Sequence, residues 1–285
     1  MTRVVYTSRP HVALVRLVSP LHIARDLLRH RELIAAYTKR EFQAAHRGTY
    51  LGLAWSVLSP LIMLALFTVV FGGIFGGKFN PNAHETPAEF ALALFIGLGF
   101  FNAFAQSMSS ASGLVLGNAA YVKTLAFPLE ILPLASVLNA LMNLMIALAI
   151  CFTAHLVMYA TLPWAVAWLA IHVVCIALLG LGVSWFLASL SVFIRDIPAV
   201  VGPANTVLMF ASGCFFPLGV MSPRIRSLVE LNPLAVIIDQ ARGCLMYAQA
   251  PDLANLAYVF AFSLAFAVAG YAFFIKTKPA FADVI

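Results

Sequence analysis

Five long stretches without any Asp, Glu, Lys or Arg alternate with short charged segments along the chain. Listed by residue number, these charge-free stretches are 48–77, 90–122, 131–194, 197–223 and 253–275. Each exceeds the roughly 20 apolar residues that a helix needs to cross about 30 Å of hydrocarbon, so the pattern predicts membrane-spanning helices. The longest stretch must hold two spans. We place its break at Thr161 to Pro163, because proline cannot continue a helix from the preceding turn.

The pattern predicts an all-α integral membrane protein with six transmembrane helices. The expected spans are 50–76, 90–116, 130–160, 164–192, 198–216 and 253–275. Composition agrees, since 62% of the residues are hydrophobic and 10% are charged, whereas soluble domains have about half and a quarter. A soluble globular core is therefore excluded. The first 20 residues lack the apolar core and cleavage site of a signal peptide, so we expect no cleaved leader.

Basic residues are concentrated before the first expected span. Residues 1–47 hold nine Lys and Arg but only three acidic residues, which accounts for most of the net charge of +6. This excess next to a membrane is typical of the positive-inside rule and does not require a nucleic acid partner. With six spans both termini share a side, and that side carries 13 of the 17 basic residues. Both termini are therefore predicted to be cytoplasmic.

Residues 20–47 predict an amphipathic helix that precedes the transmembrane domain, 48–285. At about 100° per residue, one face is apolar and consists of Ile23, Leu27, Ile34 and Tyr37. The opposite face is charged and consists of Arg25, Arg29, Glu32, Lys39 and Arg40. Such a helix suits the membrane interface, where its basic side meets anionic headgroups. It is either an anchor on membrane lipids or a docking surface for a cytoplasmic partner.

The segment 217–251 is interrupted by prolines and charges, and its apolar pieces are too short to span a membrane. We expect a re-entrant hairpin that dips back from the outer face between the fifth and sixth spans. Irregular backbone at membrane depth is tolerated only where protein or a water-filled cavity satisfies its polar groups, so such an element usually borders a pathway. The alternative is an extracellular loop with one amphipathic helix.

Catalytic and metal-binding patterns are missing from the sequence. His155 and His172 stand alone on different expected helices and are interpreted as hydrogen-bonded packing residues. The cysteines have no metal-ligand spacing and are interpreted as small buried hydrophobes. The expected spans hold no carboxylate that could couple transport to ions, and no GxxxxGK[ST] phosphate loop is present. If the protein is a transporter, a separate ATPase must supply its energy.

Several ordered motifs resemble one family of membrane proteins. They are RELIAAYTKREFQAAHRGTYLGLAWSVLSPLIMLALFTVVFGG at 31–73, NAAYVKTLAFPLEILP at 118–133, Arg195-Asp196-Ile197, and Asn232-Pro233-Leu234 followed by Arg242. This set resembles the permease subunits of polysaccharide-exporting ABC transporters of the type-2 subclass, the O-antigen, lipopolysaccharide or teichoic acid exporters. Phe100-Phe101 departs from the family, whose members often have a tryptophan after a glycine there.

The resemblance implies a homodimer in the bacterial inner membrane, with an ATPase subunit on each copy and a channel for a lipid-linked polysaccharide along the dimer axis. It implies no cofactor in this chain, because the partner ATPase binds ATP and Mg. Residues 22–42 and 117–124 would contact that partner. The implied ATPase-interface residues are Arg29, Glu32, Lys39, Arg40, Asn118, Tyr121 and Lys123. Arg195-Asp196 is either part of the same surface or, as we favour, a local ion pair that ends a helix.

The resemblance also implies two gates. Substrate would enter at a cytoplasmic gate formed by His46, Arg47, Tyr50 and Trp55. The periplasmic gate would lie in 217–247, and we assign to it the neighbouring apolar residues Phe215, Phe216, Met221 and Ile225. Aromatic faces suit a sliding sugar polymer, which makes Phe67, Phe71, Phe101 and Phe104 candidates for the channel lining.

Two other functions stay open at this point. The same architecture could export a small lipid or drug, because the width of the channel depends on how two copies pack. A membrane glycosyltransferase or acyltransferase is a more distant alternative.

Overall fold

The computed structural model describes residues 19–44, 50–70, 85–122, 127–216, 218 and 221–285. Within them the chain is helical and contains no strand. The helices are α2 (Pro20–Arg29), α3 (Arg31–Ala44), α4 (Trp55–Phe67), α5 (Pro87–Ala111), α6 (Leu114–Gly117), α7 (Ala119–Val122), α8 (Ile131–Tyr159), α9 (Leu169–Phe193), α10 (Ile197–Ala211), α11 (Pro223–Glu230), α12 (Pro233–Met246), α13 (Leu253–Thr277) and α14 (Phe281–Val284). Short 3₁₀ helices precede α4 and α9 and follow α13, at Gly52–Ala54, Trp164–Trp168 and Lys278–Ala280.

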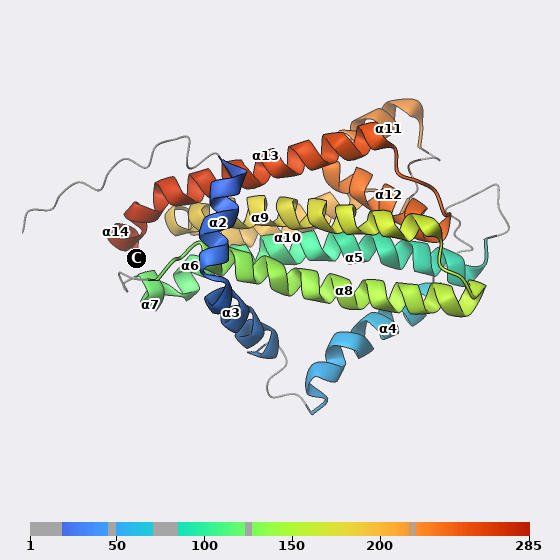
Figure 1. Cartoon of the computed structure of the whole chain (residues 1–285), viewed down its shortest axis with the longest axis horizontal. Coiled ribbons are helices and arrows are strands. Elements are labelled where there is room, and N and C mark those ends of the chain that lie inside the picture. The colour runs from blue at the N-terminus through green and yellow to red at the C-terminus, as the bar shows by residue number, and fades with distance from the viewer. Residues whose placement is uncertain (1–18, 45–49, 71–84, 123–126, 217, 219–220) are drawn as a thin grey trace, which may run out of the picture.

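The long helices α5, α8, α9 and α13 lie side by side with α10 (Figure 1). One end of this bundle, which we name the α7 end, carries α2, α3, α6, α7 and α14. The opposite end, named the α12 end, carries α11, α12 and the beginnings of α5 and α13 (Figure 1). The first described helices and the C-terminus thus share one end. This arrangement agrees with the expectation that both termini lie on one side of the membrane.

Five helical segments are long and apolar enough to cross a membrane among the described residues. They are Gly52–Val70, Pro87–Ala111, Ile131–Tyr159, Trp164–Phe193 and Leu253–Val284, and each overlaps a span expected from the sequence. The predicted break after the third span is confirmed, because α8 ends at Tyr159 and Ala160 takes a left-handed φ of 58°. The chain is therefore membrane-embedded.

The fifth expected span, 198–216, is shorter than predicted. α10 has 15 residues, which corresponds to about 22 Å and is less than a bilayer core requires. Residues 212–216 leave the helix in a turn where Gly213 has a φ of +65°. The prediction of six full spans is therefore not confirmed, and only five have the necessary length in the described part of the chain.

Local sequence signals explain where several helices begin. Thr86 accepts a hydrogen bond from the Glu89 backbone N–H while the Glu89 carboxylate accepts one from the Thr86 N–H, which forms a capping box at α5. Asp252 and Asn232 accept backbone N–H groups at the starts of α13 and α12. Proline stands at the beginning of α11 and α12, where its missing N–H is not needed.

α9 and α13 pack closely against each other through two glycines. A Cβ on Gly270 would lie only 3.0 Å from the Gly182 Cα, and a Cβ on Gly182 would lie 2.8 Å from the Phe266 carbonyl oxygen. Small residues allow this approach, as is common where helices pack inside a membrane. Nearby, the Ser189 hydroxyl hydrogen-bonds to that of Thr277. α9 and α13 therefore form a rigid pair on which the other helices pack.

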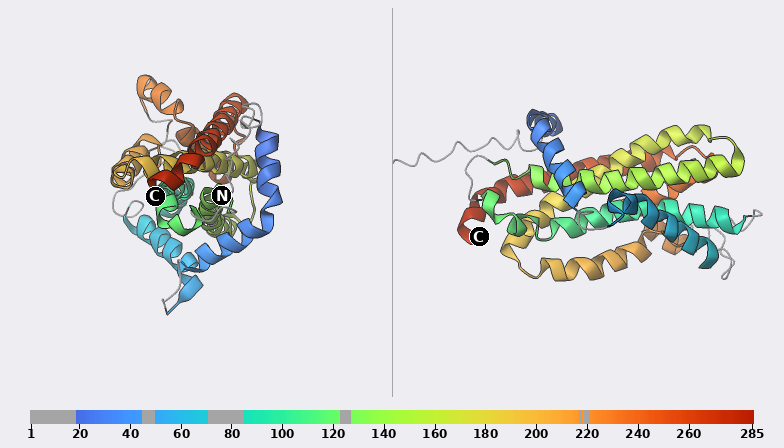
Figure 2. Two further views of the ribbon diagram at one scale, coloured as in Figure 1. Left: turned by 90° about the vertical axis from the view of Figure 1, so that its left-hand side faces the viewer. Right: turned by 90° about the horizontal axis from the view of Figure 1, so that it is seen from below.

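The amphipathic N-terminal segment forms two helices, α2 and α3, with a break at His30. Ile23, Ile34 and Tyr37 are buried, as the predicted apolar face requires. Viewed from the α7 end, the two helices form an arc along the outside of the bundle (Figure 2). The grouping of these apolar residues on one face is thus confirmed, but the face packs on the bundle, whereas the sequence placed it at the membrane interface. The role of the two helices as an interface stays a prediction.

The helices α11 and α12 occupy the segment expected to be re-entrant. α12 packs against α5, α9 and α13, whereas α11 projects from the bundle (Figure 2). Its apolar side chains Ile225 and Leu228 are exposed. Two short helices thus replace a simple loop, and their re-entrance stays a prediction.

Candidate functional site

The two segments expected to contact an ATPase meet at the α7 end. The Tyr37 hydroxyl on α3 donates a hydrogen bond to Asn118 Oδ1 at 3.3 Å. Asn118 lies between α6 and α7, and its side-chain amide donates to the Leu114 carbonyl at 2.9 Å. α3 also packs on α8, which begins just after this segment. Segments far apart in the sequence therefore form one continuous surface.

Arg40 adds a second link between these segments. Its Nη1 donates to the Tyr121 hydroxyl at 3.1 Å, and its guanidinium carbon lies 4.6 Å from the centre of the Tyr37 ring. Tyr121 in turn stacks on Phe127 at a centroid distance of 4.4 Å. The sequence pattern placed Arg40 on the face opposite Tyr37, and that placement is wrong. Arg40 follows Tyr37 by three residues and so lies beside it on α3, where a cation gains from an aromatic face and from a phenolic acceptor.

The pKa values at this contact are shifted by burial and by neighbouring charges. Burial, together with the Glu41 carboxylate, raises the pKa of Tyr37 to about 12. Burial also raises the pKa of Glu41, against the opposing influence of a hydrogen bond from Tyr37 and the charge of Arg40. The hydrogen bond to Tyr121 raises the pKa of Arg40. Tyr37 is therefore neutral and Arg40 charged at physiological pH, which the observed contact requires.

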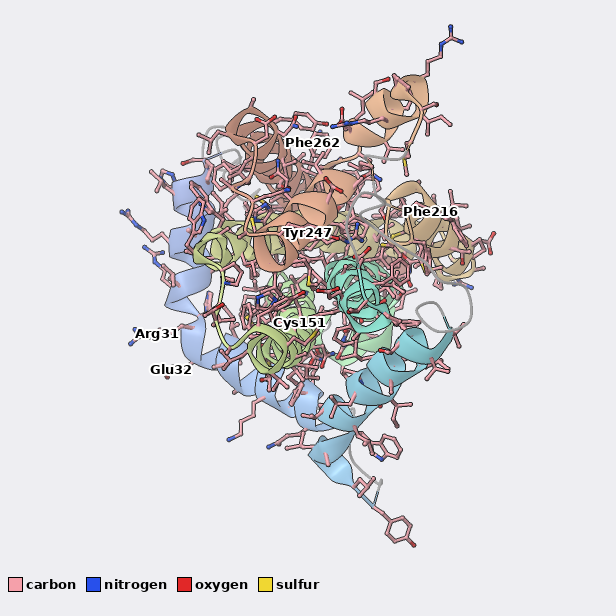
Figure 3. The ribbon with its side chains drawn as sticks, turned by 90° about the vertical axis from the view of Figure 1, so that its right-hand side faces the viewer. Arg31, Glu32, Cys151, Phe216, Tyr247 and Phe262 are labelled. Atoms are coloured by element: carbon pink, nitrogen blue, oxygen red, sulfur yellow. The ribbon has the colours of Figure 1, made fainter. Side chains whose placement is uncertain are left out.

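Other predicted interface residues project from the bundle. Arg29, Glu32 and Lys39 are exposed on α2 and α3. Arg29 lies 3.8 Å from Asp26, with both side chains largely exposed, so this ion pair contributes little to stability. Figure 3 shows Arg31 and Glu32 pointing away from the bundle. These side chains are available to a partner, and Lys123 falls outside the described residues.

Arg195 and Asp196 are exposed where α9 ends and α10 begins, at the α7 end. The local ion pair that we favoured from the sequence is wrong, because the described ion pairs do not include these two residues. Instead, Asp196 occupies the position before the first residue of α10. Both charges are therefore exposed at the α7 end.

The end of α13 is tied to the beginning of α8 beside this surface. Lys278 Nζ lies 2.6 Å from Glu130 Oε2, and both side chains are largely shielded from solvent. The Trp185 indole N–H donates to the Glu130 carbonyl at 3.2 Å, and Trp185 packs edge-to-face on Tyr271. This pairing could not be predicted, because Glu130 and Lys278 are far apart along the chain. It holds the α7 end together beneath the exposed charges.

The predicted cytoplasmic gate is only partly described. His46 and Arg47 fall outside the described residues. Tyr50 is fully exposed, and Trp55 at the start of α4 is 38% exposed. α4 has no buried residue, and most of its apolar side chains are exposed in the single chain, although Leu64 and Phe67 pack against the core. A second copy or lipid must therefore cover α4.

The four candidate channel aromatics differ in their surroundings. Phe101 is 4% exposed and packs in the core of the subunit, so it does not reach a surface that could line a channel between two copies. Phe67 and Phe104 are half-buried at the edge of that core. Phe71 falls outside the described residues. Phe67 and Phe104 are therefore partly accessible and their place in a channel stays a prediction, whereas the burial of Phe101 argues against its candidacy.

The predicted periplasmic-gate residues lie at the α12 end. Phe215 is half-buried and its ring centroid lies 5.6 Å from that of Phe210, whereas Phe216 is 57% exposed. Met221 is half-buried and Ile225 is exposed on α11. Figure 3 views this end and shows Phe216 at the edge of the bundle. Phe216 and Ile225 are thus exposed, whereas Phe215 and Met221 are partly covered, and the role of all four in a gate stays a prediction.

Sequence reasoning missed a polar network at the α12 end. The Tyr247 hydroxyl donates to Glu85 Oε1 at 3.1 Å, and the Tyr159 hydroxyl donates to Glu89 Oε1. It also missed the role of Arg242, which is 2% exposed and bonds to backbone carbonyls of two other segments. An arginine within the otherwise apolar piece 241–246 was the available signal, since buried charges are costly and retained for function.

Among the described residues, no group of His, Cys, Asp and Glu side chains is arranged to hold a metal ion. The expected absence of a metal site in the whole chain stays a prediction. His172 is buried and its ring nitrogens lie 2.8 Å from the Trp168 carbonyl and 3.2 Å from Gln240 Oε1. His155 packs on the Tyr159 ring at 4.6 Å. Cys151, Cys175, Cys214 and Cys244 are buried free thiols. The interpretation as packing residues is therefore confirmed for His172 and the four cysteines, whereas His155 is buried but its Nδ1 lacks the expected hydrogen bond among the described residues.

Comparison with known proteins gives a consistent result. The model of the ABC-2 type transporter membrane family matches residues 32–246. The O-antigen export system permease protein RfbA of Myxococcus xanthus is 24% identical over 271 residues, which cover 93% of this chain and 100% of that protein. Two proteins of the same name from Klebsiella pneumoniae are 22% and 21% identical, over 89% of this chain and 95% of theirs. The resemblance stated from the sequence motifs is confirmed.

Proposed function

Because the chain belongs to the ABC-2 type transporter family, we propose that it is the permease subunit of an exporter that moves a lipid-linked, O-antigen-like polysaccharide across the bacterial inner membrane. The family indicates a transporter subunit and not a catalytic enzyme. The observation that carries the substrate class is the similarity to O-antigen export permeases over about nine-tenths of the chain. A separate ATPase subunit supplies the energy.

The α7 end is the proposed ATPase-docking surface. The link between α3 and α7 through Tyr37, Asn118, Arg40 and Tyr121 makes one rigid platform from two segments. Lys39 and Glu32 project from this platform and supply charges for a partner. Movement of the partner during ATP hydrolysis would therefore act on both segments together and, through α8, on the bundle.

Two copies of the chain form the channel in this proposal. α4 and α10 carry apolar side chains with little or no burial, and these uncovered faces suit contact with a second copy. Phe67 and Phe104 would face the polymer, whose pyranose C–H faces stack on aromatic rings without fixed hydrogen bonds. Phe215, Phe216, Met221 and Ile225 would close the outer end by apolar contact. Leakage of small solutes through liposomes carrying Phe215→Ala/Phe216→Ala tests this gate, and unchanged permeability of the folded variant would overturn it.

The experiment that tests the proposed energy source measures ATP hydrolysis by the purified chain with and without its ATPase partner. We expect vanadate-sensitive hydrolysis only when the partner is present, because the sequence has no phosphate-binding loop. Substantial hydrolysis by the chain alone would contradict the proposal.

A further inference from the structure

A buried arginine joins three segments at the α12 end. Arg242 lies on α12 and is 2% exposed. Its Nε donates to the Ala93 carbonyl of α5 at 2.9 Å, and its Nη2 donates to the Cys214 carbonyl at 3.0 Å. Cys214 belongs to the turn that follows α10, residues 212–216, which we name the outer turn. One guanidinium thus connects α12, α5 and the outer turn.

Gly97 makes this connection possible. In a helix, the side chain four residues after a given residue normally covers the carbonyl of that residue. A side chain at position 97 would therefore cover the Ala93 carbonyl. A Cβ at Gly97 would lie 2.6 Å from Arg242 Nη2 and 3.1 Å from the Ile238 side chain. The guanidinium therefore occupies the space that the missing side chain leaves, and any larger residue at Gly97 must displace it.

The outer turn is held at the same place by weaker contacts. Cys214 is fully buried, and its Sγ lies 3.1 Å from Ser212 Oγ and 4.0 Å from the Gly97 carbonyl oxygen. Phe215 and Phe216 follow Cys214 directly. The backbone that presents these two gate residues is consequently fixed by Arg242.

An arginine in this position is costly unless it has a specific task. Removing a charge from water is strongly unfavourable, and a buried apolar side chain would serve packing alone. The planar guanidinium can direct two N–H groups toward two carbonyls at once, which a lysine ammonium cannot reproduce. Asp239, one turn earlier on α12, supplies an opposite charge.

We propose that Arg242 is a positioning residue that holds the outer turn closed against α5, and that the outer gate opens when its bond to the Cys214 carbonyl breaks. The inference rests on the proposed function only for the role of this movement in transport. The closed arrangement itself is a property of the single chain. ATP hydrolysis by a partner ATPase would release enough free energy to break one charge-assisted hydrogen bond in each cycle.

The four buried thiols provide a direct test. The full-length chain in lipid nanodiscs is treated with a maleimide, and the labelling rate of each cysteine is measured by peptide mass spectrometry. In Arg242→Lys we expect Cys214 to label about ten- to a hundredfold faster, the effect of losing one hydrogen bond to a charged group on a local opening equilibrium. Cys151, Cys175 and Cys244 should keep their slow labelling, because the rest of the bundle stays folded.

A second pair of variants keeps the arginine. Gly97→Ala should also expose Cys214, because the added Cβ displaces the guanidinium. Gly99→Ala is the matched control on the same helix, since its Cβ would make only ordinary contacts of 3.6 Å with Ala147 and Leu144. In Gly99→Ala, Cys214 should label as slowly as it does in the unmodified chain.

The labelling pattern distinguishes the possible outcomes. Selective exposure of Cys214 in both Arg242→Lys and Gly97→Ala supports the proposal, whether or not polysaccharide export is later found. Equally faster labelling of all four cysteines would show that Arg242 only maintains the fold, and this result overturns the proposal. Unchanged labelling of Cys214 in folded variants overturns it as well. A failure of the proposed transport function would appear only in export assays, so the two failures are separable.

Discussion

Arg40 and Tyr121 lie 81 positions apart in the sequence, and the arginine donates a hydrogen bond to the tyrosine hydroxyl at 3.1 Å. Tyr37 takes part in the same contact, because the guanidinium covers its ring and its hydroxyl bonds to Asn118. The contact makes α3 and α7 one platform. Because the proposed ATPase would push on this platform, its internal stability determines how faithfully motion is passed to the bundle.

Removing either partner of the Arg40–Tyr121 bond should loosen α3. We expect Arg40→Ala and Tyr121→Phe each to increase hydrogen exchange of the α3 amides, and the double variant to add little to Arg40→Ala. The coupling should be about 0.5–1 kcal/mol, because the bond involves a charge but is exposed. Fully additive effects of the two substitutions would show that the bond contributes nothing.

Reversal of the Lys39 charge should affect the partner and not the fold. Lys39 is exposed on α3, next to the platform contacts but outside them. Lys39→Glu should weaken ATPase association about three- to tenfold in a pull-down titration, which is typical for one charge at the rim of an interface. Arg224→Glu, an exposed arginine at the α12 end, is the matched control and should leave binding unchanged. If Lys39→Glu and Arg224→Glu bind the ATPase equally well, the docking surface must lie elsewhere.

Enlarging Gly270 should destabilise the α9 and α13 pair. A Cβ there would lie 3.0 Å from the Gly182 Cα, so the helices must separate. Gly270→Ala should lower the free energy of unfolding by about 1–3 kcal/mol. Its melting temperature in lipid-detergent micelles should fall accordingly. Gly202→Ala is the control, because a Cβ there would meet no atom within 4 Å, and its melting temperature should not change.

The half-buried carboxyl of Glu41 predicts a pH dependence of stability. Burial raises the pKa of Glu41, so the folded state binds its proton more tightly than the unfolded chain does. Stability then falls as pH rises from the ordinary glutamate pKa, about 4.3, through the raised folded value. Glu41→Gln removes this titration. The melting temperature of Glu41→Gln relative to the unmodified chain should therefore be higher at pH 8 than at pH 4, and a constant difference would contradict the shift.

Hydrophobic pattern was sufficient to predict most of the bundle. Charge-free stretches predicted the five long spans, and a proline predicted the break after Tyr159. α10 was predicted too long because apolar residues continue to Phe216 although Gly213 begins a turn. Composition cannot show where an apolar segment stops being helical when a glycine takes a left-handed conformation.

The long-range polar contacts could not be predicted from the sequence. The pairing of Arg40 with Tyr121 depends on how α3 and α7 pack and on the conformation of a flexible side chain. The bond from Arg242 to the Ala93 carbonyl depends on the empty space at Gly97, which only the packed helices reveal. Phe101 looked like any other aromatic in its helix, and its burial became clear only from the packing of α5.

The most direct test of the central claim is transport by the chain in proteoliposomes together with its ATPase subunit. Lipid-linked polysaccharide is loaded on the face that carries the ATPase, and its appearance on the opposite face is followed with a membrane-impermeant lectin or glycosidase. We predict movement that requires ATP, an intact ATPase and this chain, and that stops when the ATPase is inactive. Polysaccharide that stays in place while a small lipid or drug crosses, or polysaccharide that is chemically modified by the chain, would contradict the account.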